Sequence, residues 1–523
     1  MKLGRRQLLG ATLGTTQLAL LEALAPRLAH AQPMGGPSRL LTLYLPGGWM
    51  SLFAVPGLSP AQVAALVPAP WVENGAPIFF RPDQVKNLDG SSDPGRLKTP
   101  ALWNEAALRA GQPDPQAGGA TSPNGWSWVQ HRLWENALVV HGVDNMSAAH
   151  VSGTVSALTG VASSEYRAPS VQALAAAGLI GRFPDRPIPS VWIGGPEPAL
   201  LGLRPEVAPA RITSVGDVEF LLSNRRDRPW RDLRPTDVAS PMAPVTFRQA
   251  PVGGGLVLNP IEARVSRRLR SYAGRVNAPS EATLEQLHDG LLGVSRILAR
   301  DVVGRVQATR GVEFLGKPFW APAAGGVFAV EAGGFASDDG STWHAQFDLA
   351  LRLLKADVAT SVAVNCAGLR AYGFDNGHSQ GHRVQFAQVR GTFEIIGRLL
   401  AEMKQTPVGP GRSLLDDTVV LVLSDFMRTF PNAGVNSDHW PSYDVIMAGG
   451  GLRPNQAIGG YAVDLARPNE QGYDGAPIAI REPNGTVTRR PRSGDVITTA
   501  LAALGVTGIS IAGGNGDVVG ARS

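Results

Sequence analysis

Two continuous apolar segments constrain the fold of this chain more than any other feature. They are LLTLYL at residues 40–45 and TVVLVL at residues 418–423, and the first stops at Pro46-Gly47-Gly48, a sequence typical of a loop. A strand that is apolar on both faces is typical of a parallel sheet covered by helices on either side. We therefore expect both segments to be buried strands of an α/β fold.

The last third of the chain alternates between helix and strand patterns. Phe393, Ile396 and Leu400 follow one another at steps of three and four, which predicts a helix with one buried face. Helices are expected at 343–354, 383–403 and 496–504 and at the segment that opens at 151–160, and further strands at 137–143, 361–365 and 443–447. This alternation predicts a mostly parallel central sheet with helices on both faces.

The composition predicts one globular unit with long irregular connections. Apolar residues make up 44% of the chain and charged residues 17%, which is enough to bury a sizeable core. Residues 59–130 and 187–336 are interrupted by many glycines and prolines and carry weak periodicity. We interpret residues 39–523 as a single α/β domain in which those two ranges are insertions or variable regions.

The first 31 residues are typical of a twin-arginine signal peptide. Arg5 and Arg6 precede a mildly apolar run over 11–25 and a small-residue cleavage site that ends at Ala31. The alternative is an ordinary secretory leader or an uncleaved anchor. The preferred interpretation predicts recognition by the twin-arginine translocation machinery and a periplasmic or extracellular protein. No later apolar run reaches the length of a membrane span, so none is expected in the mature protein.

Charge and cysteine content exclude several functions. Of the formal net charge of +5, the leader supplies 4 − 1 = +3 through Lys2, Arg5, Arg6 and Arg27 against Glu22, and the remaining +2 does not suggest a nucleic-acid binding surface. Cys366 is the single cysteine, so neither an intramolecular disulfide nor a cysteine-ligated iron–sulfur cluster can form. A redox or cofactor-binding role is also disfavoured, because no GxGxxG motif, which is typical of dinucleotide binding, lies between a predicted strand and a predicted helix.

Residues able to do chemistry gather after the predicted strands. In open α/β sheets, ligands bind in the loops beyond the carboxyl ends of the strands. Those loops carry Asp and His residues, namely His150, Asp375, His378, His382, Asp425, Asp438 and His439. Carboxylate and imidazole together suit zinc, manganese or iron better than calcium, although each histidine taken singly also suits a structural hydrogen bond.

Several of these motifs resemble the bacterial family called domain of unknown function 1501. The resemblance rests on the leader, the Gly-Gly loop after the first strand, the segment FDNGH, the string SDFMRT and the pair Asp438-His439. It covers the first strand and most of the last third of the chain. It implies export by the twin-arginine route and a fold similar to alkaline phosphatases and sulfatases.

The resemblance also implies roles for individual residues. In the wider superfamily, an Asp and a His a few residues apart and a later His hold one metal, and Asp375, His378 and His439 match them. Met50 and Phe426 occupy the positions at which the superfamily has ligands of a second metal, so a second ion is not expected. The position of the usual nucleophile is His150, which is a candidate catalytic residue together with Asp425, although imidazole is a poor substitute for a hydroxyl that must also bind metal. Ser51, Ser152 and Thr154 lie nearby but match that position less well.

A single-metal mechanism would need no protein nucleophile. A cation on that ligand set would lower the pKa of a bound water. Asp425 would orient or deprotonate this water, and Asp438 would support a ligand imidazole. Arg428 would meet a phosphate or sulfate ester, or else form a structural ion pair. His382 is a further candidate for contact with a metal ligand or with the substrate.

Two functions therefore stay open from the sequence. The first is a metal-dependent hydrolase with one divalent ion that acts on an anionic small molecule or polymer. The second is a non-catalytic binding or assembly protein of the cell envelope that keeps the fold. The residues at Met50, Phe426 and His150 motivate the second, because they stand where catalytic groups are expected.

Overall fold

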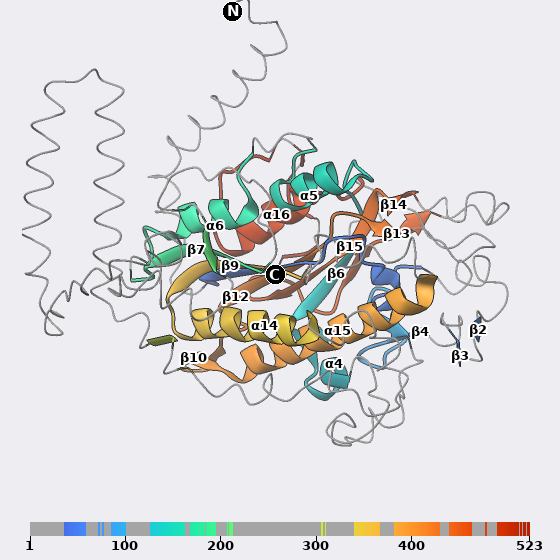
Figure 1. Cartoon of the computed structure of the whole chain (residues 1–523), viewed down its shortest axis with the longest axis horizontal. Helices are drawn as coiled ribbons and strands as arrows, with labels where there is room; N and C mark the ends of the chain where they lie inside the picture. Colours follow the sequence, from blue (N-terminus) through green and yellow to red (C-terminus); the bar gives the residue numbers. More distant parts are fainter. Residues whose placement is uncertain are drawn as a thin grey trace, which may run out of the picture.

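A computed structural model of the chain shows three layers, with helices on both faces of a central sheet (Figure 1). The structure describes residues 36–58, 72–73, 76–77, 85–100, 126–162, 168–183, 185–194, 207, 209–212, 305–306, 309, 339–366, 381–428, 439–462, 476–477 and 489–522 without 512, 515 and 519. The leader lies outside these residues.

Eight strands form the central sheet in the order β16-β6-β15-β12-β1-β9-β7-β8. Their bounds are β1 Arg39–Tyr44, β6 Ala137–Asp144, β7 Ile188–Ile193, β8 Ala210–Ile212, β9 Ala359–Asn365, β12 Thr418–Leu423, β15 Ser442–Gly449 and β16 Ala457–Gly459. Within this described sheet only β15 runs against its neighbours, β12 and β6. The expected α/β class with a mostly parallel sheet is confirmed.

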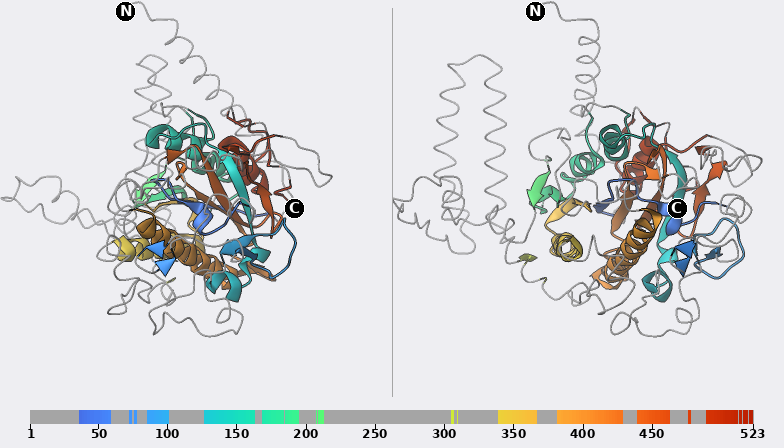
Figure 2. Two further views of the ribbon diagram at one scale, coloured as in Figure 1. Left: turned by 90° about the vertical axis from the view of Figure 1, so that its right-hand side faces the viewer. Right: turned by 45° about the vertical axis from the view of Figure 1, so that its right-hand side comes forward.

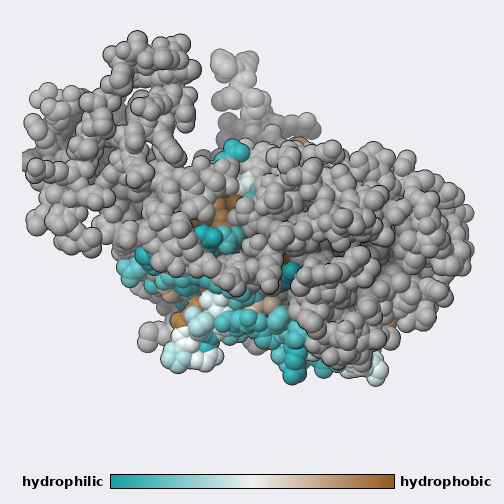
Figure 3. All heavy atoms as spheres, turned by 60° about the horizontal axis from the view of Figure 1, so that its bottom comes forward, coloured by the Kyte–Doolittle hydropathy of each residue, from teal (hydrophilic) through white to brown (hydrophobic). Residues whose placement is uncertain are grey.

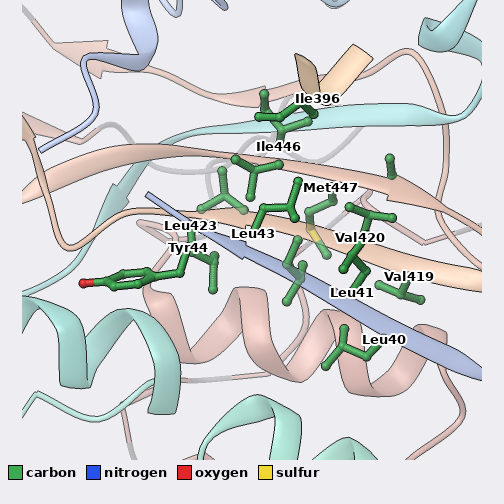
Figure 4. Packing of buried hydrophobic residues seen from close by; sticks show 14 of the residues in the cluster. Leu40, Leu41, Leu43, Tyr44, Ile396, Val419, Val420, Leu423, Ile446 and Met447 are labelled. Atoms are coloured by element: carbon green, nitrogen blue, oxygen red, sulfur yellow. The ribbon is translucent and has the colours of Figure 1, made fainter. Parts of the chain in front are cut away.

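The two continuous apolar segments, residues 40–45 and 418–423, are neighbours at the centre of the sheet. β1 pairs in parallel with β12 from Arg39 opposite Thr418 to Tyr44 opposite Leu423, and every residue of both strands is buried. β9 pairs with the other edge of β1. Figure 4 shows side chains of β1, β12 and β15 packed against one another, with Ile396 of a covering helix above them. Burial of both faces is the reason that these strands carry no polar alternation.

Helices cover the sheet in two groups, which all three ribbon views separate (Figures 1 and 2). One face carries α5 His150–Thr159, α6 Val171–Leu179 and α16 Ser493–Ala503. The opposite face carries α4 Trp126–Gln130, α14 Asp339–Lys355 and α15 Gly381–Gln405. The predicted helices over 343–354, 383–403 and 496–504 correspond to α14, α15 and α16. None of the described helices has the length and apolar character needed to cross a membrane.

The two ranges expected as insertions differ in the structure. Within 59–130, the described strands form two-stranded hairpins apart from the main sheet, namely β2 Val72–Glu73 with β3 Ala76–Pro77 and β4 Val85–Asn87 with β5 Lys98–Pro100. The range 187–336, by contrast, contributes β7 and β8 to the main sheet. Pro189 and Ser190 interrupt the apolar sequence of β7. The strand therefore lacks the continuous apolar pattern by which β1 and β12 were predicted.

The described residues on one face of the molecule are mostly polar. The described side chains that reach the face shown in Figure 3 are predominantly hydrophilic, with small apolar areas between them. Among the described residues, Val151 at 46% and Val408 at 39% are the large hydrophobic side chains that stand exposed. Apolar residues are therefore gathered in the core, as expected for a globular unit.

Candidate functional site

The carboxyl ends of β1, β6 and β12 meet at one edge of the sheet. These strands run in the same direction, so the loops after Tyr44, Asp144 and Leu423 leave on the same side. A short hairpin of β13 Met427–Arg428 and β14 His439–Trp440 follows the loop after β12 and lies near the start of α5 (Figure 1). This is the edge at which open α/β sheets bind ligands.

Asp425 is the centre of the described site. Its side chain is wholly buried, and Oδ1 accepts hydrogen bonds from the backbone N–H groups of Gly47 and Gly48, both at 2.9 Å. The N–H of Phe426 donates to the same oxygen at 3.2 Å, whereas the hydroxyl of Ser424 donates to the carbonyl oxygen of Leu45 at 2.7 Å. A buried carboxylate needs such donors, and here they fix the loop after β1 against the loop after β12.

The Gly-Gly loop folds tightly around this carboxylate. Gly48 has a φ of +81°, a conformation that favours glycine. A Cβ at this position would lie 2.6 Å from the Phe426 ring and 2.8 Å from the Arg428 guanidinium. The small residue therefore allows the backbone to approach Asp425 closely, which gives the Gly-Gly pair of the sequence a local physical reason.

His150 contacts the second oxygen of Asp425. Its Nδ1 lies 2.8 Å from Asp425 Oδ2, and the side chain is 19% exposed. A carboxylate only accepts hydrogen bonds, so Nδ1 carries the proton and Nε2 carries the lone pair in the neutral ring. His150 is the first residue of α5, as expected for the helix that opens in this segment. The two residues expected to be catalytic are thus in direct contact.

His439 lies against the same pair. Its ring centroid is 4.7 Å from that of His150 in an edge-on arrangement and 4.1 Å from that of Phe426 in a stacked one. Nδ1 of His439 donates to the carbonyl oxygen of Ala148 at 2.7 Å, which places the lone pair of the neutral ring on Nε2. A backbone carbonyl on the distal nitrogen is the usual partner of a histidine that binds metal.

Arg428 supports the loop from the other side. Its side chain is wholly buried, and Nε and Nη2 donate to the carbonyl oxygen of Gly47 at 3.2 and 2.8 Å. The guanidinium also lies 5.6 Å from the Phe426 ring centroid. Both contacts hold the Gly47–Gly48 loop in place, so the structure places Arg428 within the framework of the site.

Asn145 is a functional candidate that sequence reasoning missed. Its side-chain amide donates to the carbonyl oxygens of Asp425 and Gly153, the latter at 3.0 Å, and its Oδ1 accepts from Ser493 at 2.7 Å. It therefore joins the loop after β12 to α5 and to the start of α16. The sequence feature that could have identified Asn145 is its position shortly after the strand predicted at 137–143.

A second buried polar cluster adjoins the site. The wholly buried Asp444 accepts hydrogen bonds from Ser51 at 2.9 Å, from the N–H of Gly142 at 3.1 Å and from the hydroxyl of Tyr461. His141 Nδ1 lies 3.2 Å from Asp444. The sequence feature that could have indicated this cluster is an aspartate within the otherwise apolar strand β15. Ser51, considered as a nucleophile, belongs to this cluster.

The remaining predicted site residues are not described at the level of their side chains. Asp375, His378 and Asp438 lie outside the described residues, and of His382 only its place near the start of α15 is described. In the described part of the chain, no three Asp, Glu, His or Cys side chains are grouped so that they could hold a metal ion. The predicted ligand set therefore stays a prediction, with His439 as its described member.

Cys366 lies at the end of β9 and is wholly buried. Burial raises the pKa of its thiol, so the thiolate that would act as nucleophile or ligand is disfavoured. The side chain is a packing residue of the core.

The fold and this cluster define an α/β protein with a histidine–carboxylate site at the carboxyl edge of a mostly parallel sheet. The family described as protein of unknown function (DUF1501) matches residues 336–471, which supports membership of that family. The matched range includes Asp425, Arg428 and His439, whereas His150 lies before it. No curated protein and no solved structure is significantly similar to the chain.

Proposed function

We propose that the protein is an exported single-metal hydrolase of phosphate or sulfate esters. The observation that carries this proposal is the buried carboxylate of Asp425 in contact with His150, whose ring lies beside His439. The segments that follow β6 and β12, far apart in the sequence, supply these groups. An acid–base pair at the ligand-binding edge of the sheet is a typical arrangement for hydrolysis.

His150 is the group of this pair that faces the reacting centre. Asp425 has no exposed surface, and its oxygens are hydrogen-bonded within the chain. It therefore acts through His150, by fixing the ring and its tautomer and by stabilising the imidazolium. This role replaces the direct deprotonation of water that the sequence suggests for Asp425.

His439 fits the role of a metal ligand. The hydrogen bond from its Nδ1 to Ala148 orients the ring and keeps the lone pair on Nε2. Asp375 and His378 are the proposed companion ligands. A divalent ion of zinc, manganese or iron there would act as a Lewis acid on the ester.

One ion is proposed because apolar residues occupy the positions matched to a second. Met50 is wholly buried, and the Phe426 ring packs on His439. Neither side chain supplies a carboxylate or imidazole to a cation.

Metal content and turnover test the proposal together. We expect about one equivalent of zinc, manganese or iron in protein purified from the periplasm, and hydrolysis of p-nitrophenyl phosphate or sulfate. His439→Ala should lose both. His131→Ala is the matched control, because His131 follows α4 and contacts Gln405. Metal-free protein without activity on either ester would contradict the proposal.

A non-catalytic envelope binding or assembly protein is the second candidate. The Phe426 ring favours it, because its contacts with both His150 and His439 close part of the site with an apolar surface. If this candidate is correct, Phe426→Asp should leave the protein without esterase activity and should weaken capture of envelope material. A gain of activity would speak against it.

Export by the twin-arginine machinery to the periplasm or beyond is part of the proposal. Arg5 and Arg6 carry it. Replacement of both by lysine should retain the protein in the cytoplasm, as cell fractionation would show. Replacement of Arg27, which lies after the apolar run, is the control and should leave export unchanged. Equal export of all three chains would contradict this route.

A further inference from the structure

Several polar side chains lie buried between the central sheet and α6. We propose that ordered water molecules bind there, on hydroxyl, indole and amide groups that β1, β7, β9 and α6 supply. The buried polar set consists of Thr42, Gln172, Ser190, Trp192 and Ser361. The inference concerns the core under α6, away from Asp425 and His150, and does not depend on the proposed function.

Thr42 faces the layer that contains α5 and α6. In β1, the hydroxyl of Tyr44 lies 2.5 Å from the hydroxyl of Thr154 in α5. Residues two apart in a strand share one face of the sheet, so Thr42 faces the same layer as Tyr44. Within this layer, α6 packs on β1, β7 and β9 (Figure 1). The face of the sheet that carries Thr42 is therefore the face that α6 covers.

Strand pairing brings the other three sheet residues to the same face. Ala363 of β9 pairs with Thr42, and Trp192 of β7 pairs with Ala363. Two residues earlier in β9, Ser361 pairs with Ser190 of β7. Paired residues of neighbouring strands point to the same side of the sheet, and such strands lie about 4.8 Å apart. The polar groups therefore occupy two adjacent rows across β1, β9 and β7.

These sheet residues are buried without a hydrogen-bond partner in the protein. Thr42 and Ser361 have no exposed surface, and Ser190 and Trp192 are 1% exposed. Within the described part of the chain, their three hydroxyl oxygens and the indole nitrogen of Trp192 are buried polar atoms that no protein group satisfies. Buried polar groups in folded proteins are nearly always hydrogen-bonded, either to the protein or to ordered water. Water is therefore the partner that we assign to this set.

Gln172 adds an amide from the helix. Its side chain is 1% exposed, and neither its oxygen nor its nitrogen has a partner among the protein groups that the structure describes. Gln172 precedes Ala175 and Leu179, both in the hydrophobic core, by three and seven residues, so the three lie on one face of α6. An amide both donates and accepts hydrogen bonds. Gln172 can therefore bind water on the buried side of the helix.

The chemistry of the set favours water over an ion. The residues of β1, β7 and β9 on this face are all uncharged. A buried ion would need an opposite charge, whereas water donates and accepts hydrogen bonds without one. Water between a helix and a sheet requires small side chains, and Ser190, Ser361 and Ala363 in the sheet and Ala175 in α6 supply them. Because a buried water makes about three hydrogen bonds, one molecule can join Ser190 to Ser361.

A high-resolution crystal structure of the purified protein is the direct test. We expect ordered water oxygens at about 2.7–3.2 Å from the side chains of Ser190, Ser361 and Gln172. Absence of ordered water beside these three side chains overturns the proposal, whatever the stability of any variant.

Apolar replacements test the same waters in solution. Ser361→Ala and Gln172→Met remove polar atoms with little change of shape, and each should lower the urea midpoint of unfolding, because hydrogen bonds to bound water are lost. If these groups had no water partner, removal of an unpaired buried polar group would raise the midpoint. Gln405→Met, at the exposed end of α15, is the control and should leave the midpoint unchanged. An unchanged or raised midpoint in either core variant overturns the proposal.

Discussion

At the scale of single residues, Asp425 organises the site because its two oxygens serve different neighbours. Oδ1 gathers backbone N–H groups from the loop after β1, while Oδ2 faces His150. The first interaction shapes the loop and the second sets the tautomer of the histidine. A change that keeps the shape of Asp425 but removes its charge therefore separates the two effects.

Asp425→Asn should lower kcat by about 10²- to 10⁴-fold while the protein stays folded. The amide N–H₂ would face Nδ1 of His150 and shift the ring proton to Nε2, so the lone pair would no longer face the substrate. Steady-state kinetics with p-nitrophenyl phosphate, together with a thermal melt, measures both properties. An unchanged kcat in the folded variant would show that the contact of Asp425 with His150 has no catalytic role.

Gly153→Ala should disturb the same pair through packing. A Cβ at Gly153 would lie 2.5 Å from the carbonyl oxygen of Asp425, which is too close for the backbone to remain in place. We expect a loss of about 1–3 kcal/mol in the free energy of unfolding, measured with urea, and a fall in activity. Gly409→Ala is the control, because nothing lies within 4 Å of its Cβ position. Equal stability of both variants would contradict the close approach of α5 to Asp425.

The sequence predicted part of the site at this scale. His150, Asp425 and His439 were found because each follows a recognisable strand end. Asn145 and Asp444 were missed because their roles depend on partners far away in the chain, such as Ser493 and Ser51. Hydrogen bonds between such distant residues leave no local pattern in the sequence.

At the scale of elements, the continuous apolar runs were reliable guides. The bounds of β12 agree with the predicted strand, and β1 lies one residue earlier than expected. The antiparallel direction of β15 and the place of β7 in the sheet were not predictable in the same way. Both depend on the path of the chain through space, which a local pattern does not encode.

Leu43→Ala should destabilise the protein by about 2–5 kcal/mol. Leu43 is wholly buried in β1, the strand that pairs with both β9 and β12. Removal of its side chain leaves a cavity at the centre of the sheet. Val408→Ala, on the exposed strand β10 Pro407–Gly409, should change stability by less than about 0.5 kcal/mol. Urea unfolding compares the two, and similar losses would place β1 outside the core.

At the scale of the whole molecule, an ionic cluster joins segments at the amino end of the sheet. Arg39 of β1 and Arg186 before β7 both contact Asp357 Oδ1 at 2.6 Å, and Arg39 also pairs with Asp417 before β12. Burial and the nearby charge of Arg186 lower the pKa of Arg39 to about 10. The cluster ties together four neighbouring strands, β12, β1, β9 and β7, at the edge opposite the site.

This cluster predicts loss of stability in acid. Burial raises the pKa of Asp357, but the charges and hydrogen bonds of Arg186 and Arg39 together outweigh this effect and hold the pKa below its usual value. A lowered carboxyl pKa contributes stability that is present above the unfolded value and is lost as pH falls through the folded value. Urea unfolding between about pH 5 and pH 3 should show this loss.

Asp357→Asn should remove part of that pH dependence. Since the Asp357 side chain is 44% exposed, solvent screening keeps its contribution modest. Asp93→Asn, in the exposed loop between β4 and β5, is the control and should follow the unmodified protein. An identical pH profile for all three proteins would exclude the cluster as a source of acid sensitivity.

The position of β1 has a consequence for biosynthesis. The strand emerges from the ribosome among the first segments, yet its neighbours β9 and β12 begin at residues 359 and 418. Until those segments have been translated, both hydrogen-bonding edges of β1 lack their native partners, and such edges favour aggregation. A nascent chain that stops before residue 418 should therefore depend on chaperones, whereas the completed chain can bury its earliest strand.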